Sequence, residues 1–168
     1  MSESGCLRNE NVENLNVNGI ILGQRRPVKL LTARGDAGAH AAITAAESGT
    51  IFLVPAMASG SGTRTIALPA ASNAVGCTYT FVVVGATVGN TFNVEAAGSE
   101  KIVALIPKGD GDNTAAGGTV YDSIGFLAAA PIGSSFKLIC MSTTANAEWY
   151  AHDVIDGLAA NVGSLVLA

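Results

Sequence analysis

The sequence predicts an all-β protein, an antiparallel β-sandwich or small jelly-roll-like barrel that follows an extended N-terminal arm. Three observations predict it. Apolar and polar residues alternate with period two in short runs, turn-forming residues separate these runs about every ten residues, and the start of the chain has few apolar residues. A length of 168 residues suits a single domain. We therefore assign residues 1–35 to the arm and residues 36–168 to one β-sandwich domain.

Strands are expected where β-branched and aromatic residues alternate with polar ones. The strongest run spans 77–84, in which Tyr79, Phe81 and Val83 share one face. Two earlier runs each stop at a proline, which cannot donate a ladder hydrogen bond. The expected strands, in chain order, are 50–54, 64–68, 77–84, 91–95, 101–106, 119–124, 135–141 and 148–154. Their apolar faces predict a core of Phe52, Tyr79, Phe81, Phe92, Leu105, Phe136 and Trp149.

The N-terminal arm is rich in asparagine, since residues 9–19 carry five Asn and two Glu. Such a stretch buries little apolar surface to offset the entropy lost on ordering. Two interpretations stay open: a frayed terminus, and an arm that becomes ordered against a neighbouring subunit or partner protein. On the second interpretation the arm reaches to about Arg26, and sparse apolar anchors and two guanidinium groups make the contacts. The expected contact residues are Leu15, Val17, Ile20, Arg25 and Arg26.

The C-terminal tail, residues 157–168, is uncharged and apolar. An exposed tail of this kind is an aggregation hazard. It is therefore expected either to form a strand in its own sheet or to pair with another chain. The second alternative favours a homo-oligomer.

Composition and charge exclude several classes of protein. The net charge of −4 gives no electrostatic footprint for nucleic acid. No stretch reaches the roughly 18 consecutive apolar residues of a membrane span, and the N-terminus lacks the pattern of a signal peptide. Three widely spaced cysteines form neither a disulfide framework nor a zinc site. We expect Cys77 and Cys140 to be small buried side chains and Cys6 to be an exposed thiol.

Catalytic motifs are missing from the sequence, so we expect no enzyme activity. There is no Gly-x-Ser-x-Gly nucleophile motif and no phosphate-binding loop. His152 is expected to be a half-exposed strand residue, although a pair formed by Cys140 and His152 stays open. Glu95 and Glu100 flank a turn and are expected to be solvated, so they form no catalytic carboxylate pair.

The acidic loop around Asp110 and Asp112 resembles the start of a calcium loop. A calcium loop also needs a bidentate Glu eleven residues after its first Asp, and Tyr121 stands at that position. We expect an acidic hairpin loop, with a weak surface Ca²⁺ or Mg²⁺ site as the alternative. No cofactor or metal residue is assigned.

Four short patterns follow one another along residues 43–155. They are Thr-Ala-Ala-x-Ser-Gly at 44–49, Ile-x-Leu-Pro at 66–69, Gly-x-x-Tyr-x-Phe at 76–81, and a last hairpin that bears Trp149. In this order they resemble the β-rich structural domains of tailed-phage virions, found in decoration (cement) proteins and in fibre or tail-spike proteins. The resemblance implies a non-enzymatic building block that is commonly a homotrimer.

The resemblance further implies where such a chain acts and what it contacts. The expected function is that of a decoration protein that binds the outer head surface and stabilises it, in a virion assembled in the host cytoplasm. Its expected partners are the major capsid protein or another virion protein, without nucleic acid or membrane. A tail fibre, spike or receptor-binding domain that recognises a host surface glycan is the alternative, and a small hydrolase that uses His152 is a further one.

Overall fold

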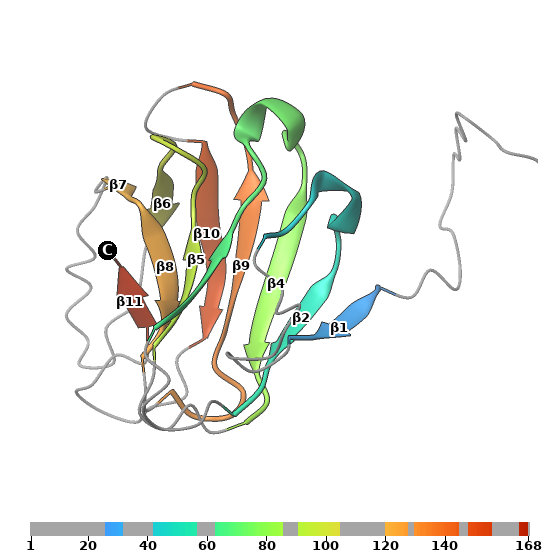
Figure 1. The fold of residues 1–168 in the computed structure, drawn as a ribbon, viewed down its shortest axis with the longest axis vertical. Coiled ribbons are helices and arrows are strands. Elements are labelled where there is room, and N and C mark those ends of the chain that lie inside the picture. Colours follow the sequence, from blue (N-terminus) through green and yellow to red (C-terminus); the bar gives the residue numbers. More distant parts are fainter. Residues whose placement is uncertain are drawn as a thin grey trace, which may run out of the picture.

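The structure, a computed structural model, describes residues 26–31, 42–56, 63–85, 91–104, 120–127, 130–144, 148–155 and 165–167. Two β-sheets pack face to face as a sandwich (Figure 1). The larger sheet consists, in spatial order, of β1 (Val28–Leu30), β2 (Ile51–Val54), β4 (Thr78–Val83), β9 (Ser135–Cys140), β10 (Trp149–Ile155), β6 (Ile102–Ala104) and β7 (Val120–Tyr121). The smaller sheet consists of β11 (Leu165–Leu167), β8 (Ser123–Phe126), β5 (Phe92–Glu95) and β3 (Arg64–Ala67). The predicted all-β sandwich is confirmed.

Two short 3₁₀ helices connect strands at one end of the sandwich. Helix η1 (Ala45–Glu47) precedes β2, and η2 (Ala71–Asn73) lies between β3 and β4. Thr44 and Glu47 form a capping box at η1, since the Thr44 N–H donates to Glu47 Oε2 at 2.9 Å. The Tyr79 hydroxyl donates to the Thr44 carbonyl at 3.0 Å and ties this turn to the core.

The expected strand positions agree with the structure wherever it describes the chain. Each predicted run contains a strand, and the run at 119–124 is divided into β7 and the start of β8. Two strands lie outside the eight expected runs. The first is β1, which lies within the segment assigned to the arm and is followed by Leu31, buried at 1% exposure. The sandwich therefore takes in residues 28–31.

The second of these strands, β11, decides between the two alternatives for part of the C-terminal tail. Strand β11 pairs antiparallel with β8, with Leu165 opposite Phe126 and Leu167 opposite Ile124. Residues 165–167 thus form a strand in the chain's own sheet. The tail no longer argues for pairing with another chain, so any case for self-association must come from elsewhere on the surface.

The strand pairing is mixed. Strands β1, β2 and β4 are parallel neighbours, as are β3 and β5, and β6 and β10. The described pairs that involve β8 or β9 are antiparallel. Hydrophobic alternation reports which side of a strand is buried but not the direction of its neighbour, so an antiparallel sandwich was the expectation.

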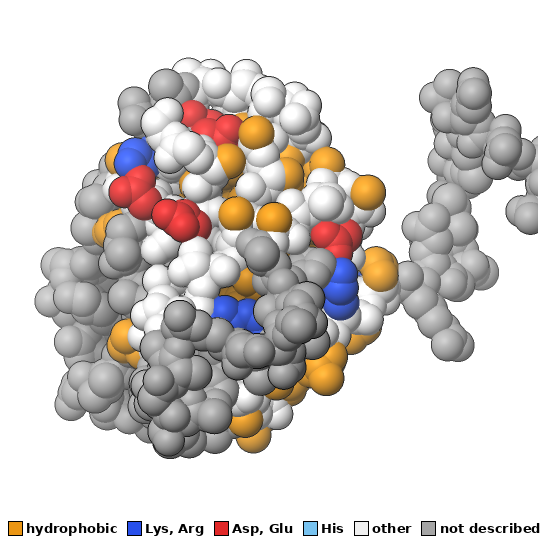
Figure 2. Space-filling model, in the orientation of Figure 1, with side chains coloured by type: hydrophobic (Ala, Val, Ile, Leu, Met, Phe, Trp, Pro, Cys, Tyr) orange, Lys and Arg blue, Asp and Glu red, His pale blue; other side chains and the backbone are white. Residues whose placement is uncertain are grey.

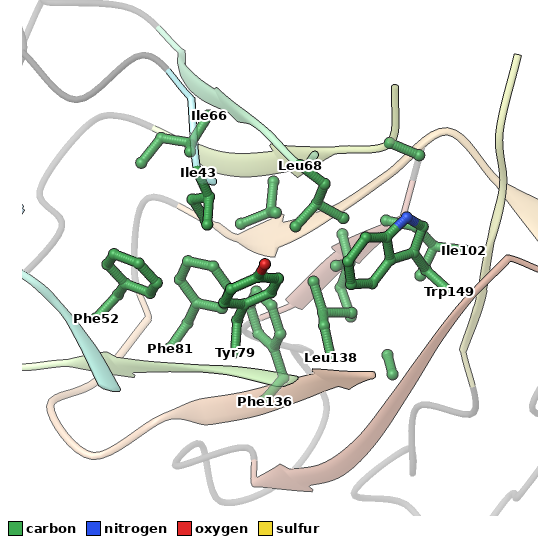
Figure 3. Close-up of a cluster of buried hydrophobic side chains, with 14 of the residues drawn as sticks. Ile43, Phe52, Ile66, Leu68, Tyr79, Phe81, Ile102, Phe136, Leu138 and Trp149 are labelled. Carbon is green, nitrogen blue, oxygen red and sulfur yellow. The ribbon is translucent and has the colours of Figure 1, made fainter. Parts of the chain in front are cut away.

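The core lies between the two sheets and is dominated by stacked aromatic rings. Figure 3 shows Phe52, Phe81 and Phe136 side by side on the larger sheet, facing Ile66 of the smaller one. The Phe81 ring centroid lies 5.0 Å from that of Phe136. Of the seven predicted core residues, six are fully buried and Leu105 lies outside the described residues. The core also contains Leu31, Ile43, Ile66, Ile102, Ile124, Phe126 and Leu138.

Candidate interaction surface

The outer face of the larger sheet exposes large hydrophobic side chains to solvent. Strand register joins its outward-facing residues into three rows that cross the sheet. The first row is Thr78, Ile139, Tyr150, Val103 and Val120. The second is Val28, Ile51, Thr80, Lys137 and His152, and the third is Leu30, Leu53, Val82, Ser135 and Ile155. We call these three rows the apolar face, because aliphatic side chains predominate in them.

Large side chains on the apolar face reach solvent. Val28 and Leu30 are each 61% exposed, Ile155 is 59% exposed, and Met141 at the end of β9 is exposed as well. Figure 2 shows hydrophobic side chains gathered at the margin where Figure 1 places β1 and β2. The aliphatic side chains are continuous from β1 to β4 in the third row, through Leu30, Leu53 and Val82, whereas Thr80, Lys137 and His152 interrupt the second row. An apolar patch that extends over neighbouring strands marks an interaction site in a soluble protein more often than single exposed residues do.

The outer face of the smaller sheet is different. Its outward positions on β3, β5 and β8 carry polar or small residues, and Thr65 and Glu95 among them are exposed. These positions are Thr65, Ala67, Asn93, Glu95, Ser123 and Gly125. The outer face of this sheet therefore lacks the aliphatic rows of the larger sheet, although its Ser123 and Gly125 positions are buried.

Strand β1 carries the margin of the apolar face, and none of the described strands pairs with its outer edge. The Leu31 N–H donates to the Leu53 carbonyl at 2.9 Å, and the Ile51 N–H donates to the Pro27 carbonyl at 2.8 Å. Because alternate residues of a strand direct their backbone groups to opposite sides, Val28 and Leu30 direct theirs away from β2. The side chains and the backbone of these two residues are therefore both available at one margin.

An ion pair fixes β1 from the inner side. The Lys29 ammonium lies 2.8 Å from Glu47 Oε1. Partial burial raises the pKa of the Glu47 carboxyl, but hydrogen bonds from Lys29 and from the Thr44 backbone and hydroxyl outweigh it and lower that pKa to about 2. A lysine often protects a sheet edge against pairing, and here η1 holds the lysine of β1 instead.

The charges of the apolar face neutralise one another near its middle. A bulge in β10 gives Asp153 a φ of 51° and brings its carboxylate to 3.2 Å from His152 Nδ1 and 4.0 Å from Lys137 Nζ. His152 is half-exposed, as predicted. The cluster leaves no strong net charge to select a charged partner.

The residues predicted to contact a partner lie mostly outside the described part of the chain. Leu15, Val17, Ile20 and Arg25 are in that group. Arg26 is described, and it is exposed immediately before β1. The acidic loop at Asp110 and Asp112 lies outside the described residues too.

The pair of Cys140 and His152 that the sequence left open is not formed in the structure. Cys140 faces the core and is buried, whereas His152 faces outward on the neighbouring strand. Burial raises the pKa of the Cys140 thiol, which disfavours the thiolate that a nucleophile needs. Within the described ranges, no three His, Cys, Asp or Glu side chains come together to hold a metal ion.

Glu100 is not solvated as expected, although Glu95 is exposed. Glu100 Oε1 accepts the Ala71 N–H at 2.8 Å, and Oε2 lies 3.4 Å from Trp149 Nε1. Nearby, buried Glu148 accepts the Lys101 N–H at 2.9 Å. Both carboxylates satisfy backbone donors at strand and helix starts, so their role is to hold the fold.

Comparison with known proteins adds no relative: no protein-family model matches the chain, and no curated protein matches it. Among the described residues, no helix is long and apolar enough to cross a membrane. The apolar face is thus the main functional lead in the structure. Sequence reasoning missed it because it followed only the buried side of each strand, although Val28, Leu30, Ile51 and Leu53 were visible as apolar residues.

Proposed function

We propose that this protein is a non-enzymatic structural protein of a virion, a decoration protein that binds the outer surface of the head and stabilises the shell. The observation that carries the structural role is the apolar face, because a sandwich that exposes aliphatic side chains on its larger sheet is suited to packing against protein, while attachment to the head is assigned to the N-terminal arm. The resemblance of residues 43–155 to virion β-domains supplies the setting. The expected partner is the major capsid protein or another virion protein.

The glycan-binding alternative has less support. Sugar recognition commonly uses exposed aromatic side chains, because their flat faces stack on sugar rings. Trp149 is fully buried. Among the exposed large hydrophobic residues that the structure describes, Tyr150 is the one with an aromatic ring. The hydrolase alternative loses its cysteine–histidine pair, as described above.

The number of copies per particle tests the proposal directly. Quantitative mass spectrometry of purified virions is expected to find hundreds of copies, as a head surface requires. A handful of copies would place the chain on the tail, and its absence from purified particles would refute a virion role.

The attachment of the protein tests the role assigned to the arm. Deleting residues 2–24 removes the predicted contacts at Leu15, Val17 and Ile20 but leaves β1 and Arg26 in place. The truncated chain is expected to fold yet to lose binding to undecorated heads, since many arms act together on one shell. Binding equal to that of the full chain would transfer attachment to the sandwich.

A further inference from the structure

The apolar face has dimensions that suit an interface. Summed over the lengths of the seven strands, a rise of about 3.4 Å per residue and a spacing of about 4.8 Å give a flat footprint of roughly 500 Å². A stable protein interface takes about 800 Å² of accessible surface from each partner. Side chains that protrude from the sheet add accessible area to this flat footprint, so the face supplies most of the area that one partner of such an interface buries.

The chemistry of the face favours a partner of the same kind. Aliphatic side chains predominate in its first and third rows, and the Lys137 ammonium in the second row lies 4.0 Å from the Asp153 carboxylate. A patch without strong net charge has no electrostatic reason to repel its own copy or to prefer a charged surface. A flat apolar sheet can pack on another at about 10 Å, as the two sheets of this sandwich already do.

We infer that the apolar face packs against a second copy of this chain. Val28 and Leu30 lie at one margin of the contact, Tyr150 and Ile139 lie within it, and Ile155 lies at the bulged end of β10. The inference rests on the proposed structural role, which it deepens by naming the partner of one surface. The arm remains available for the shell.

The test compares two double variants that make the same chemical change at matched exposure. Val28→Gln with Leu30→Gln alters the margin of the apolar face, where both residues are 61% exposed. Val75→Gln with Ile132→Gln alters two turn residues that are 58% and 67% exposed and lie outside the three rows. Neither pair changes the net charge, so a difference between them reports the location of the substitution.

Sedimentation equilibrium of the full chain over a micromolar range measures the outcome. The wild-type chain is expected to have a mass of two or more times the 16.9 kDa of one chain. The Val28/Leu30 variant is expected to raise the dissociation constant at least about tenfold, because truncating apolar contacts in an interface commonly costs that much, while the turn variant stays near wild type. A wild-type monomer throughout the range, or equal effects of the two variants, would overturn the inference.

Circular dichroism and thermal unfolding show whether each variant keeps the fold. If the Val28/Leu30 variant does not fold, Ile155→Gln decides, since Ile155 lies on a different strand of the same face. It is expected to weaken association severalfold, and no change would count against the inference. Copy number in virions is measured separately, so a failure of the virion role and a failure of self-association give different results.

Discussion

The two outer faces of the sandwich follow different rules. On the smaller sheet, outward positions carry Thr65, Asn93 and Glu95, and the inward positions are apolar apart from buried Arg64 on β3. On the larger sheet, outward positions on β1 and β2 carry Val28, Leu30 and other aliphatic residues. The difference teaches that the fold alone does not require the apolar face, since the same chain builds a sheet without one.

The sharpest way to test this comparison lies within β10, where neighbouring residues face opposite sides. Trp149→Ala is expected to lower the free energy of unfolding by about 3–5 kcal/mol, because the side chain is fully buried and its ring lies 5.8 Å from that of Tyr79. Tyr150→Ala, on the apolar face, is the matched control. It is expected to change the free energy of unfolding of the monomer by less than about 1 kcal/mol. Urea unfolding at low protein concentration measures both. Similar losses would mean that the apolar face already belongs to a core.

The smaller sheet offers the next effect. A Cβ added at Gly125 would collide with the carbonyl oxygen of Phe92 on the neighbouring strand. Gly125→Ala is therefore expected to destabilise the fold by about 1–3 kcal/mol. Thr65→Ala, two strands away in the same row and exposed, is the control and is expected to stay within about 0.5 kcal/mol. If thermal unfolding finds the same loss of stability in the two variants, β5 and β8 do not approach each other as closely at Gly125 as described.

The margin of the apolar face gives a smaller, pH-dependent effect. The folded-state pKa of Glu47 is lowered to about 2 from 4.5, so its stabilisation is present above pH 4.5 and is lost as the pH falls toward 2. Glu47→Gln is expected to cost about 1 kcal/mol at neutral pH, because Lys29 and Glu47 form a surface pair. Denaturant unfolding from pH 7 to acid should show the wild-type advantage vanish. An advantage that persists unchanged in acid would contradict the assignment.

The smallest expected effect is a difference in reactivity between two thiols on the inner side of the larger sheet. In a Cys6→Ser background, Cys77 is partly exposed whereas Cys140 is buried and its pKa is raised by that burial. An aromatic disulfide reagent is expected to modify Cys77 first, and Cys140 only when the fold opens. Cys6→Ser/Cys77→Ser isolates the slow thiol. Equal rates for the two thiols would show that the end of β9 is open.

The local alternation of apolar and polar residues predicts most strands and their buried sides. It does not predict how the strands pair or which surface is apolar. The run at 77–84 places Tyr79, Phe81 and Val83 inside because a strand has only two sides. Parallel pairing, and the entry of β1 and β11 into the sheets, depend on contacts between residues far apart in sequence. The Thr-x-x-Glu pattern at 44–47 was a readable signal for the cap of η1, but nothing local announces that Glu47 holds Lys29.

The placement of β9 has a consequence for how the chain is made. This strand lies between β4 and β10 in the larger sheet, yet only β10 follows it among the strands of that sheet. At about 5–20 residues per second, a ribosome needs roughly 3–10 s to proceed from the end of β4 to the end of β9. During that time Tyr79 and Phe81 have no Leu138 or Phe136 beside them. The sheet therefore cannot close before β9 has been made, and a nascent chain exposes its aromatic core until then.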